Sequence, residues 1–202
     1  MGFIKRKAPK IEPFKLAIFA SGKGSNAEKI IQYFDNEQLV KILMIVCNNP
    51  QAGVLDIAKQ HNIKTLVIDK KTFTQTEEYV QLLKIEGITH IILAGFLWKV
   101  PETMINGYRN KILNIHPALL PNFGGKGMYG DKVHEAVIAS GQKETGITIH
   151  LVDEHYDHGK TVFQATTSVE EYDTQATIAQ KVHALEHHHY PRVIAEWLGT
   201  KQ

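Results

Sequence analysis

The sequence predicts an α/β protein, a single domain built on a mostly parallel twisted sheet with helices on both faces. Three observations lead to this fold class. Short continuous apolar runs alternate along the chain with segments whose apolar residues recur at helical spacing. After about residue 145 the pattern changes to alternating apolar and polar residues, which predicts an antiparallel extension of the sheet. The length of 202 residues suits one domain or one domain with an appendage.

The first two thirds of the chain supplies the parallel part. Five apolar runs predict strands that are buried on both faces, at residues 16–20, 42–47, 65–68, 90–94 and 112–115. The segments between them predict helices at residues 26–34, 54–61 and 76–86. Strands that alternate with helices form βαβ units, which give a parallel sheet covered on both sides.

The last third of the chain predicts a different arrangement. Residues 146–151 and part of 161–169 alternate apolar and polar side chains, as half-exposed strands do. Residues 174–198 form one long helical pattern, in which Pro191 is expected to introduce a kink. We find no internal repeat and no linker, so residues 14–202 are expected to form one domain after a basic arm at residues 1–13.

Charge and composition limit the partners. The chain has 23 Lys and Arg against 21 Asp and Glu, which is too balanced for a protein that binds nucleic acid backbones. No apolar run reaches the roughly 18 residues of a membrane span, so no membrane partner is expected. Cys47 is the single cysteine and cannot form an internal disulfide, which fits a reducing compartment. We therefore expect a soluble, compact, cytoplasmic protein.

A glycine-containing loop follows the first predicted strand. Its sequence, SGKGSN at residues 21–26, opens a helix whose free N–H groups and dipole suit a phosphate. The dinucleotide-binding pattern fits poorly, because a third glycine is absent and Asn48 and Asn49 follow the second strand where an acidic residue is expected. The alternative interpretation is a turn in which Ser25 or Asn26 only caps the helix.

Polar side chains also follow the fifth strand and the first strand of the C-terminal part. Asn114 and His116 are two residues apart, so an extended chain points both to the same side, where they can hold an oxyanion and move a proton. Farther along, either Asp153 or Asp157 can orient an imidazole or a water molecule. A structural histidine and an ordinary Asp-Gly turn are the alternatives.

Three further features remain open to two interpretations. His183 and His187 have metal-capable spacing, but without HExxH, CxxC or a third ligand we expect no metal and a surface or pocket-lining cluster. Residues 93–98 can line a pocket for a flat heterocycle or simply pack in the core. The glycine-rich segment 123–133 is either a mobile flap or a surface loop.

Taken together and in this order, the motifs are recognisable. They are SGKGSN at 21–26, CNN at 47–49, AGF at 94–96, NIHPALLP at 114–121, GITIHLVDEHYDHG at 146–159 and EHHHYP at 186–191. The chain resembles the phosphoribosylglycinamide formyltransferases over about residues 14–198. The resemblance implies a Rossmann-like formyltransferase fold. It also implies transfer of a formyl group from 10-formyltetrahydrofolate, the cosubstrate, to the amine of glycinamide ribonucleotide in purine biosynthesis, without a metal.

The resemblance also assigns roles to individual residues. It implies a catalytic triplet of Asn114, His116 and Asp157, and the aspartate that precedes x-Gly is the one chosen. The implied contacts are Gly24, Ser25 and Asn26 to the substrate phosphate, Glu186 to its ribose, and Leu97, Trp98 and Val100 to the folate. In this scheme Asp157 is expected to raise the pKa of His116, so that a charged imidazole faces the oxyanion.

Some alternatives remain. Another formyl-folate enzyme is one of them, either a hydrolase that releases formate or a transferase that acts on a tRNA or a sugar nucleotide. A non-catalytic nucleotide-binding module that uses only residues 21–26 is less consistent with the triplet, and an oxidoreductase is less consistent with the missing acidic residue. Trp98-Lys99 stands where many relatives carry an Arg followed by an aliphatic residue, which puts the folate contacts in question. Both a monomer and a homodimer remain open.

Overall fold

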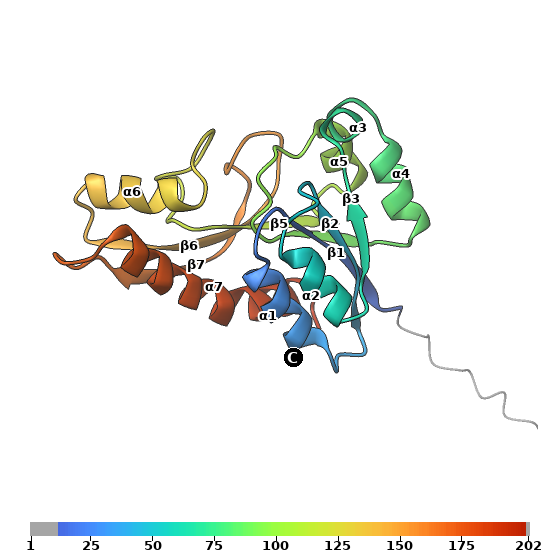
Figure 1. Ribbon diagram of the computed structural model, residues 1–202, viewed down its shortest axis with the longest axis horizontal. Helices are drawn as coiled ribbons and strands as arrows, with labels where there is room; N and C mark the ends of the chain where they lie inside the picture. The colour runs from blue at the N-terminus through green and yellow to red at the C-terminus, as the bar shows by residue number, and fades with distance from the viewer. Residues whose placement is uncertain (1–11, 201–202) are drawn as a thin grey trace, which may run out of the picture.

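The computed structural model describes residues 12–200, and the seven strands in this range lie in one sheet (Figure 1). The strands are β1 (Phe14–Ala20), β2 (Val40–Cys47), β3 (Lys64–Val67), β4 (His90–Leu93), β5 (Ile112–His116), β6 (Glu144–Leu151) and β7 (Thr161–Ser168). Their spatial order is β3-β2-β1-β4-β5-β6-β7. The pairs from β3 to β5 are parallel, and β6 and β7 pair antiparallel. The predicted fold class is therefore confirmed.

Strand β1 shows why the parallel strands are continuous apolar runs. Leu16 and Ile18 belong to one buried cluster, and Ala17 and Phe19 belong to another on the opposite face of the sheet. Successive side chains of a strand point to opposite faces, so a strand covered on both sides has no position for a polar side chain. The sheet accordingly has one hydrophobic core on each face.

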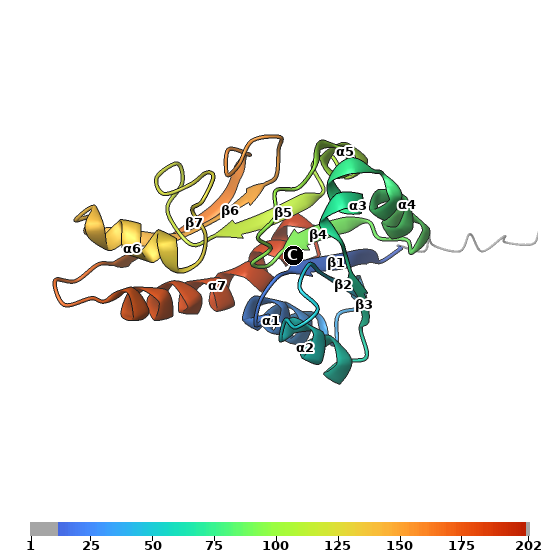
Figure 2. The same cartoon turned by 45° about the horizontal axis from the view of Figure 1, so that its top comes forward.

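Helices cover both faces (Figures 1 and 2). One face carries α1 (Ser25–Phe34), α2 (Val54–Gln60) and α7 (Gln175–Trp197), whose buried residues share one core. The other face carries α3 (Lys70–Gln75), α4 (Glu78–Ile85) and α5 (Glu102–Gly107). The remaining helix, α6 (Asp131–Ala139), packs against α7. This arrangement leaves the loops after the parallel strands at one edge of the sheet.

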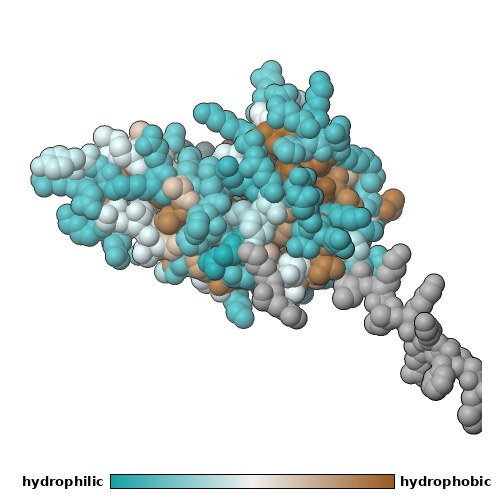
Figure 3. Space-filling view, turned by 90° about the horizontal axis from the view of Figure 1, so that it is seen from below, coloured by the Kyte–Doolittle hydropathy of each residue, from teal (hydrophilic) through white to brown (hydrophobic). Residues whose placement is uncertain are grey.

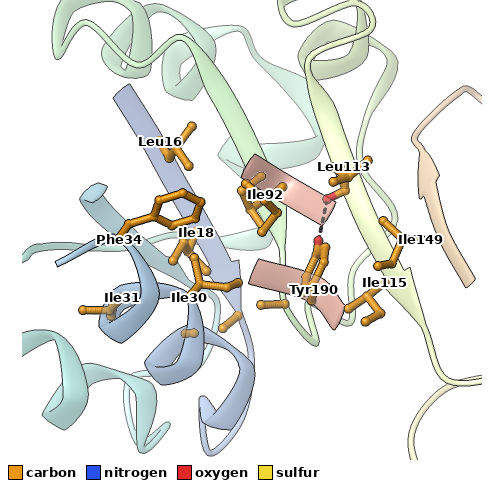
Figure 4. Close-up of a cluster of buried hydrophobic side chains, with 14 of the residues drawn as sticks. Leu16, Ile18, Ile30, Ile31, Phe34, Ile92, Leu113, Ile115, Ile149 and Tyr190 are labelled. Atoms are coloured by element: carbon orange, nitrogen blue, oxygen red, sulfur yellow. Dashed lines mark hydrogen bonds between the residues drawn. The ribbon is translucent and has the colours of Figure 1, made fainter. Parts of the chain in front are cut away.

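Helix α7 is anchored to the middle of the sheet by Tyr190. This side chain is fully buried, and its hydroxyl oxygen lies 2.9 Å from the carbonyl oxygen of Leu93 and 3.0 Å from that of Leu113 (Figure 4). Leu93 is the last residue of β4 and Leu113 is the second residue of β5, so the hydroxyl can donate to either strand. Burial raises the pKa of Tyr190 well above its ordinary value, which keeps the hydroxyl protonated as a donor.

The structure adds three short helices, α3, α5 and α6, which the sequence pattern did not predict. Helices α3 and α5 have six residues each, too few for an apolar stripe to repeat. Helix α6 begins directly after the glycine-rich segment, so the loop predicted at 123–133 ends at Gly130. Helix α7 continues through Pro191, which is buried. Residues 1–11 of the predicted basic arm lie outside the described residues.

The surface is mostly hydrophilic on the side that Figure 3 shows. Hydrophobic residues lie there in patches between the hydrophilic ones. Within residues 12–200, no helix combines the length and the apolar character needed to cross a membrane.

Candidate active site

A cavity of about 570 Å³ lies at the carboxyl ends of the parallel strands. The loops after β1, β4 and β5 line this cavity. The strand order reverses here, because the chain runs from β1 outward to β2 and β3 on one side and then returns to place β4 on the other side of β1. Such a reversal of strand order opens a crevice between the two loops, which is where open α/β sheets bind ligands. Every site residue predicted from sequence lines this cavity: Gly24, Ser25, Asn26, Leu97, Trp98, Val100, Asn114, His116, Asp157 and Glu186.

At one end of the cavity the loop after β1 presents the start of α1. Gly24 has a φ of +84°, and a Cβ atom there would lie 2.7–2.9 Å from atoms of Val54, so only glycine fits. The N–H groups of Ser25 and Asn26 have no hydrogen-bond partner among the described residues. Neither side chain caps the helix, so the alternative of an ordinary cap is not seen. The free N–H groups and the helix dipole suit an anion.

Glu186 of α7 closes this end of the cavity. Its side chain is 5% exposed, and its Oε2 accepts a hydrogen bond of 2.8 Å from Asn26 Nδ2. Burial raises the pKa of Glu186, and the Asn26 hydrogen bond and the nearby His183 offset part of that rise. The hydrogen bond links the anion-binding loop to a carboxyl group that can bind hydroxyl groups.

The other polar end of the cavity contains the predicted triplet. His116 is nearly fully buried at the end of β5, and its Nδ1 lies 3.7 Å from Asp157 Oδ2. Asp153 instead accepts a hydrogen bond of 2.8 Å from the backbone N–H of His155, within its own turn. Of the two carboxylates left open by the sequence pattern, Asp157 is therefore the one beside the imidazole.

The structure brings a fourth polar side chain, His150, into the same cluster. The antiparallel register of β5 and β6 places it opposite Asn114, whose Nδ2 lies 3.0 Å from His150 Nε2. His150 Nδ1 lies 2.9 Å from the carbonyl oxygen of Leu151, so the ring proton of the neutral imidazole belongs on Nδ1 and Nε2 accepts from Asn114. The same Nε2 lies 3.7 Å from Asp157 Oδ1.

The electrostatic balance at His116 differs from the expectation. Burial lowers the pKa of His116 by more than Asp157 and the Phe123 carbonyl raise it, so the net shift is downward. Asp157 does raise the pKa of His116 as expected, but the expected net direction was wrong, because the ring is almost fully removed from water, which disfavours the charged form. Burial also raises the pKa of Asp157, but His150, His116 and the N–H of Gly125 lower it by more, so this carboxyl group remains ionised.

The glycine-rich segment contacts the cluster directly. The carbonyl oxygen of Phe123 lies 2.8 Å from His116 Nε2, and the N–H of Gly125 donates to Asp157 Oδ2 at 2.8 Å. Because a carbonyl only accepts, Nε2 carries the ring proton of neutral His116 and Nδ1 faces the carboxylate. Residues 125–130 also line the cavity, so this segment is part of the site.

An apolar wall borders the third side. The rings of Phe73, Phe96 and Trp98 lie within 5.7–6.2 Å of one another, centroid to centroid. Leu97 is half exposed, and its N–H donates to Ser21 Oγ at 2.9 Å, which links the loops after β1 and β4. Core packing and lining of a pocket were the two interpretations of residues 93–98, and both apply, because these residues pack in the core and also line the cavity.

Metal ligation finds no support in the geometry. Within residues 12–200 no three His, Cys, Asp or Glu side chains are grouped to hold an ion. His183 and His187 stack with ring centroids 6.2 Å apart, and His183 lines the cavity. The interpretation of a pocket-lining cluster describes His183 correctly.

Comparison with known proteins places this geometry in a family. The sequence model described as "Formyl transferase" matches residues 14–194. The chain belongs to the formyl transferase family. A relative named phosphoribosylglycinamide formyltransferase, from Bacillus subtilis, is 37% identical over 190 residues, covering 92% of this chain and 95% of its own. A chloroplastic protein of the same name from Arabidopsis thaliana is 39% identical over 89% of this chain, which spans 64% of the length of that relative.

Solved structures within the family agree. The phosphoribosylglycinamide formyltransferase of Bacillus halodurans superposes with a TM-score of 0.83 at 39% identity, covering 91% of this chain and 95% of its own. That of Anaplasma phagocytophilum has a TM-score of 0.82 at 32% identity, over 91% and 86% of the two chains. Identity at this level together with near-complete superposition supports the family assignment and the fold.

Two cavity residues of this formyl transferase escaped the sequence reasoning. His150 sits in an alternating strand pattern, and only its pairing with Asn114 across β5 and β6 shows that it faces the site. His134 of α6 is 2% exposed and lines the cavity, although α6 itself was not predicted. Local spacing carried no signal for either, because both reach the site through long-range packing.

Proposed function

We propose that this protein transfers the formyl group of 10-formyltetrahydrofolate to the amine of phosphoribosylglycinamide. The carrying observation is that one cavity joins an anion-binding helix start, a buried carboxyl group and the Asn114, His116 and Asp157 cluster. The names of the relatives point to the same reaction. A phosphate-binding module alone would not require the polar cluster at the far end of the cavity.

The phosphoribosyl half of the amine substrate fits the end of the cavity near α1. In this proposal Gly24, Ser25 and Asn26 hold the phosphate through free N–H groups and the helix dipole. Glu186, held by Asn26, accepts hydrogen bonds from the ribose hydroxyl groups. The amine then extends toward His116 in the same cavity.

The formyl donor fits the remaining part. Leu97, Trp98 and Val100 border an apolar wall beside the polar cluster, which suits a flat heterocycle carrying a reactive nitrogen. A cavity of about 570 Å³ lies within the ordinary range for small-molecule sites. These three side chains contribute shape and exclusion of water, and Lys99, between Trp98 and Val100, adds a positive charge to the cavity lining.

The chemistry assigned to the cluster requires no covalent intermediate with the protein. When the amine attacks the formyl carbon, negative charge develops on the formyl oxygen. The Asn114 amide and the Nε2–H of His116 are the donors proposed to stabilise it, in place of their present partners His150 and Phe123. Ionised Asp157, 3.7 Å from His116 Nδ1, favours a proton gained by that nitrogen, and it positions a water molecule that carries the proton from the amine to the departing folate nitrogen.

The cellular setting belongs to the same proposal. A cytoplasmic location suits the buried free thiol of Cys47, because reducing compartments keep single cysteines unpaired.

A formyl-transfer assay tests the function. Purified protein is incubated with phosphoribosylglycinamide and 10-formyltetrahydrofolate, and formylated product and free formate are measured in parallel. We expect formylated product and released tetrahydrofolate in equal amounts. Formate without formylated product would identify a hydrolase and contradict the proposal.

A further inference from the structure

His134 is a buried imidazole in the cavity that the proposed chemistry does not use. It lies on α6, which packs against α7, and only 2% of the residue is exposed. Its Nδ1 is buried and has no hydrogen-bond partner within residues 12–200. A buried polar atom without a partner costs free energy, so an apolar residue would be expected here if packing were the only requirement.

The second ring nitrogen is placed differently. Nε2 of His134 is not fully buried, and it has no hydrogen-bond partner within residues 12–200. Because His134 lines the cavity, Nε2 is the ring atom that a bound molecule can reach. In the neutral imidazole one nitrogen donates and the other accepts. Depending on the tautomer, Nε2 can therefore donate to the carbonyl oxygen of an amide or accept from its N–H group.

The neighbours of His134 locate it along the cavity. It is close enough to His116 and His183 that a charge on either of them lowers its pKa, an effect that adds to the larger effect of burial. His116 marks the reacting end of the cavity, and His183 lies one turn before Glu186, at the phosphoribosyl end. His134 therefore lies near both ends of the cavity, which in the proposed binding mode is beside the part of the substrate that joins its ribose to its amine.

We propose that neutral His134 hydrogen bonds through Nε2 to the amide of the glycinamide arm and orients the amine toward the formyl carbon. The ribose hydroxyl groups already have Glu186, and the phosphate has the start of α1, so the amide is the polar group of the substrate left without a partner. The inference rests on the proposed function and adds a substrate-binding residue to it. Specificity for an amide over an apolar arm would follow, since an apolar arm would leave Nε2 unpaired.

Three variants at this position separate substrate binding from packing. His134→Leu fills much of the space and removes both nitrogens. His134→Gln can place an amide near Nε2, and His134→Asn can place one near Nδ1. Steady-state kinetics with phosphoribosylglycinamide and 10-formyltetrahydrofolate, and inhibition by ribose 5-phosphate, are measured for each. His90→Leu is the control, because His90 is partly buried and does not line the cavity.

For His134→Leu we expect the KM for phosphoribosylglycinamide to rise about tenfold, the scale of one lost hydrogen bond to a desolvated group. The KM for the formyl donor and the inhibition constant of ribose 5-phosphate should change less than about twofold, because neither ligand carries the amide arm. Glutamine should recover most of the loss, and asparagine should not. His90→Leu should change thermal stability and leave both KM values unaltered.

Other outcomes overturn the inference. If asparagine restores the KM and glutamine does not, His134 acts through Nδ1 as a structural residue. Equal changes in the KM for both substrates, or an unchanged KM in His134→Leu, would also contradict it while the proposed function stands. If the unmodified protein transfers no formyl group, the proposed function fails first and this inference fails with it.

Discussion

At the scale of single residues, the candidate site depends on which hydrogen-bond partner each nitrogen has. His116 donates from Nε2 to Phe123 and turns Nδ1 to Asp157, while His150 donates from Nδ1 and accepts from Asn114 through Nε2. The two rings therefore present opposite nitrogens to the same carboxylate. The carbonyl groups of Phe123 and Leu151 therefore orient the two rings, and each ring turns its unprotonated nitrogen toward the Asp157 carboxylate, 3.7 Å away, which favours a proton gained there.

Removal of the Asp157 charge is the most direct test of this arrangement. Asp157 has a φ of +57°, which asparagine tolerates as well as aspartate, so Asp157→Asn should fold normally. We expect kcat to fall by roughly 10²–10⁴, the usual scale for a positioned acid–base group. The KM for phosphoribosylglycinamide should change little, because Asp157 lies at the opposite end of the cavity from the phosphate loop.

Asp153→Asn is the matched control, since Asp153 also lines the cavity but holds only its own turn. It should lose less than about tenfold in kcat, below the range of a positioned acid–base group. Circular dichroism of both variants confirms folding. The assignment would be wrong if Asp153→Asn were the impaired variant, or if both variants kept near-normal kcat.

Asn26 tests the phosphate-binding end. Asn26→Ala removes a side chain at the helix start and the hydrogen bond to Glu186. Because a phosphate contact is similar in the ground and transition states, the KM for phosphoribosylglycinamide should rise much more than kcat falls. Asn49→Ala is the control, since Asn49 does not line the cavity. An unchanged KM in Asn26→Ala would remove this loop from the substrate site.

At the scale of elements, the site is assembled where helix α7 meets the ends of the parallel strands. Tyr190 fixes α7 to β4 and β5, and Glu186, one turn earlier on the same helix, reaches the start of α1. Figure 4 shows Tyr190 among the apolar side chains of this core. Packing of α7 thus places Glu186 beside the start of α1.

Tyr190→Phe tests this anchor. The variant keeps the ring and removes the hydroxyl, so it leaves buried carbonyl oxygens with one partner fewer. We expect a loss of about 1–2 kcal/mol in the free energy of unfolding, as is usual for a buried hydrogen bond. Urea denaturation followed by fluorescence measures it, and kcat is expected to stay within several-fold of the parent protein. An unchanged midpoint of unfolding would show that the hydroxyl does not hold the helix.

At the scale of the whole molecule, several buried histidines make stability depend on pH. Burial, assisted by Lys111, lowers the pKa of His90 to about 4, and its ring packs edge-on to those of Phe14 and Trp197. The unfolded chain takes up a proton near pH 6.5 and the folded protein only near pH 4. Between these values the unfolded state binds more protons, so stability falls as the pH is lowered through this window.

His90→Phe isolates this contribution. The thermal midpoint of the parent protein should fall between pH 7 and pH 5, and that of the variant should fall less. Because His90 is only partly buried, we expect the difference at pH 5 to be of order 1 kcal/mol. Thermal unfolding of both proteins at the two pH values measures it. If both midpoints fall by the same amount, His90 does not titrate as described.

Metal dependence is a second property of the whole molecule. Because the proposed chemistry uses hydrogen-bond donors and a carboxylate, a chelator should leave formyl transfer intact. Elemental analysis should find no stoichiometric zinc. Activity that disappears with the chelator and returns with zinc would instead assign a metal to the stacked pair His183 and His187.

The sequence alone was sufficient for the order and type of the main elements. Buried parallel strands have a continuous apolar pattern, and the change to alternation marked the antiparallel part of the sheet. The expected half exposure is confirmed for β7 but was wrong for β6, which is buried on both faces because its polar side chains Thr148 and His150 have hydrogen-bond partners inside the protein. Motif resemblance also selected ten residues that share one cavity. Short helices escaped prediction because six residues hold too little periodicity.

Only the tertiary structure could decide the remaining features of the site. The pairing of Asn114 with His150 depends on the register between β5 and β6, and His134 reaches the cavity because α6 packs on α7. The downward pKa shift of His116 results from near-complete burial, which outweighs the neighbouring carboxylate. Each of these features depends on contacts between residues that are distant in the chain, so the local spacing of residues in the sequence could not predict it.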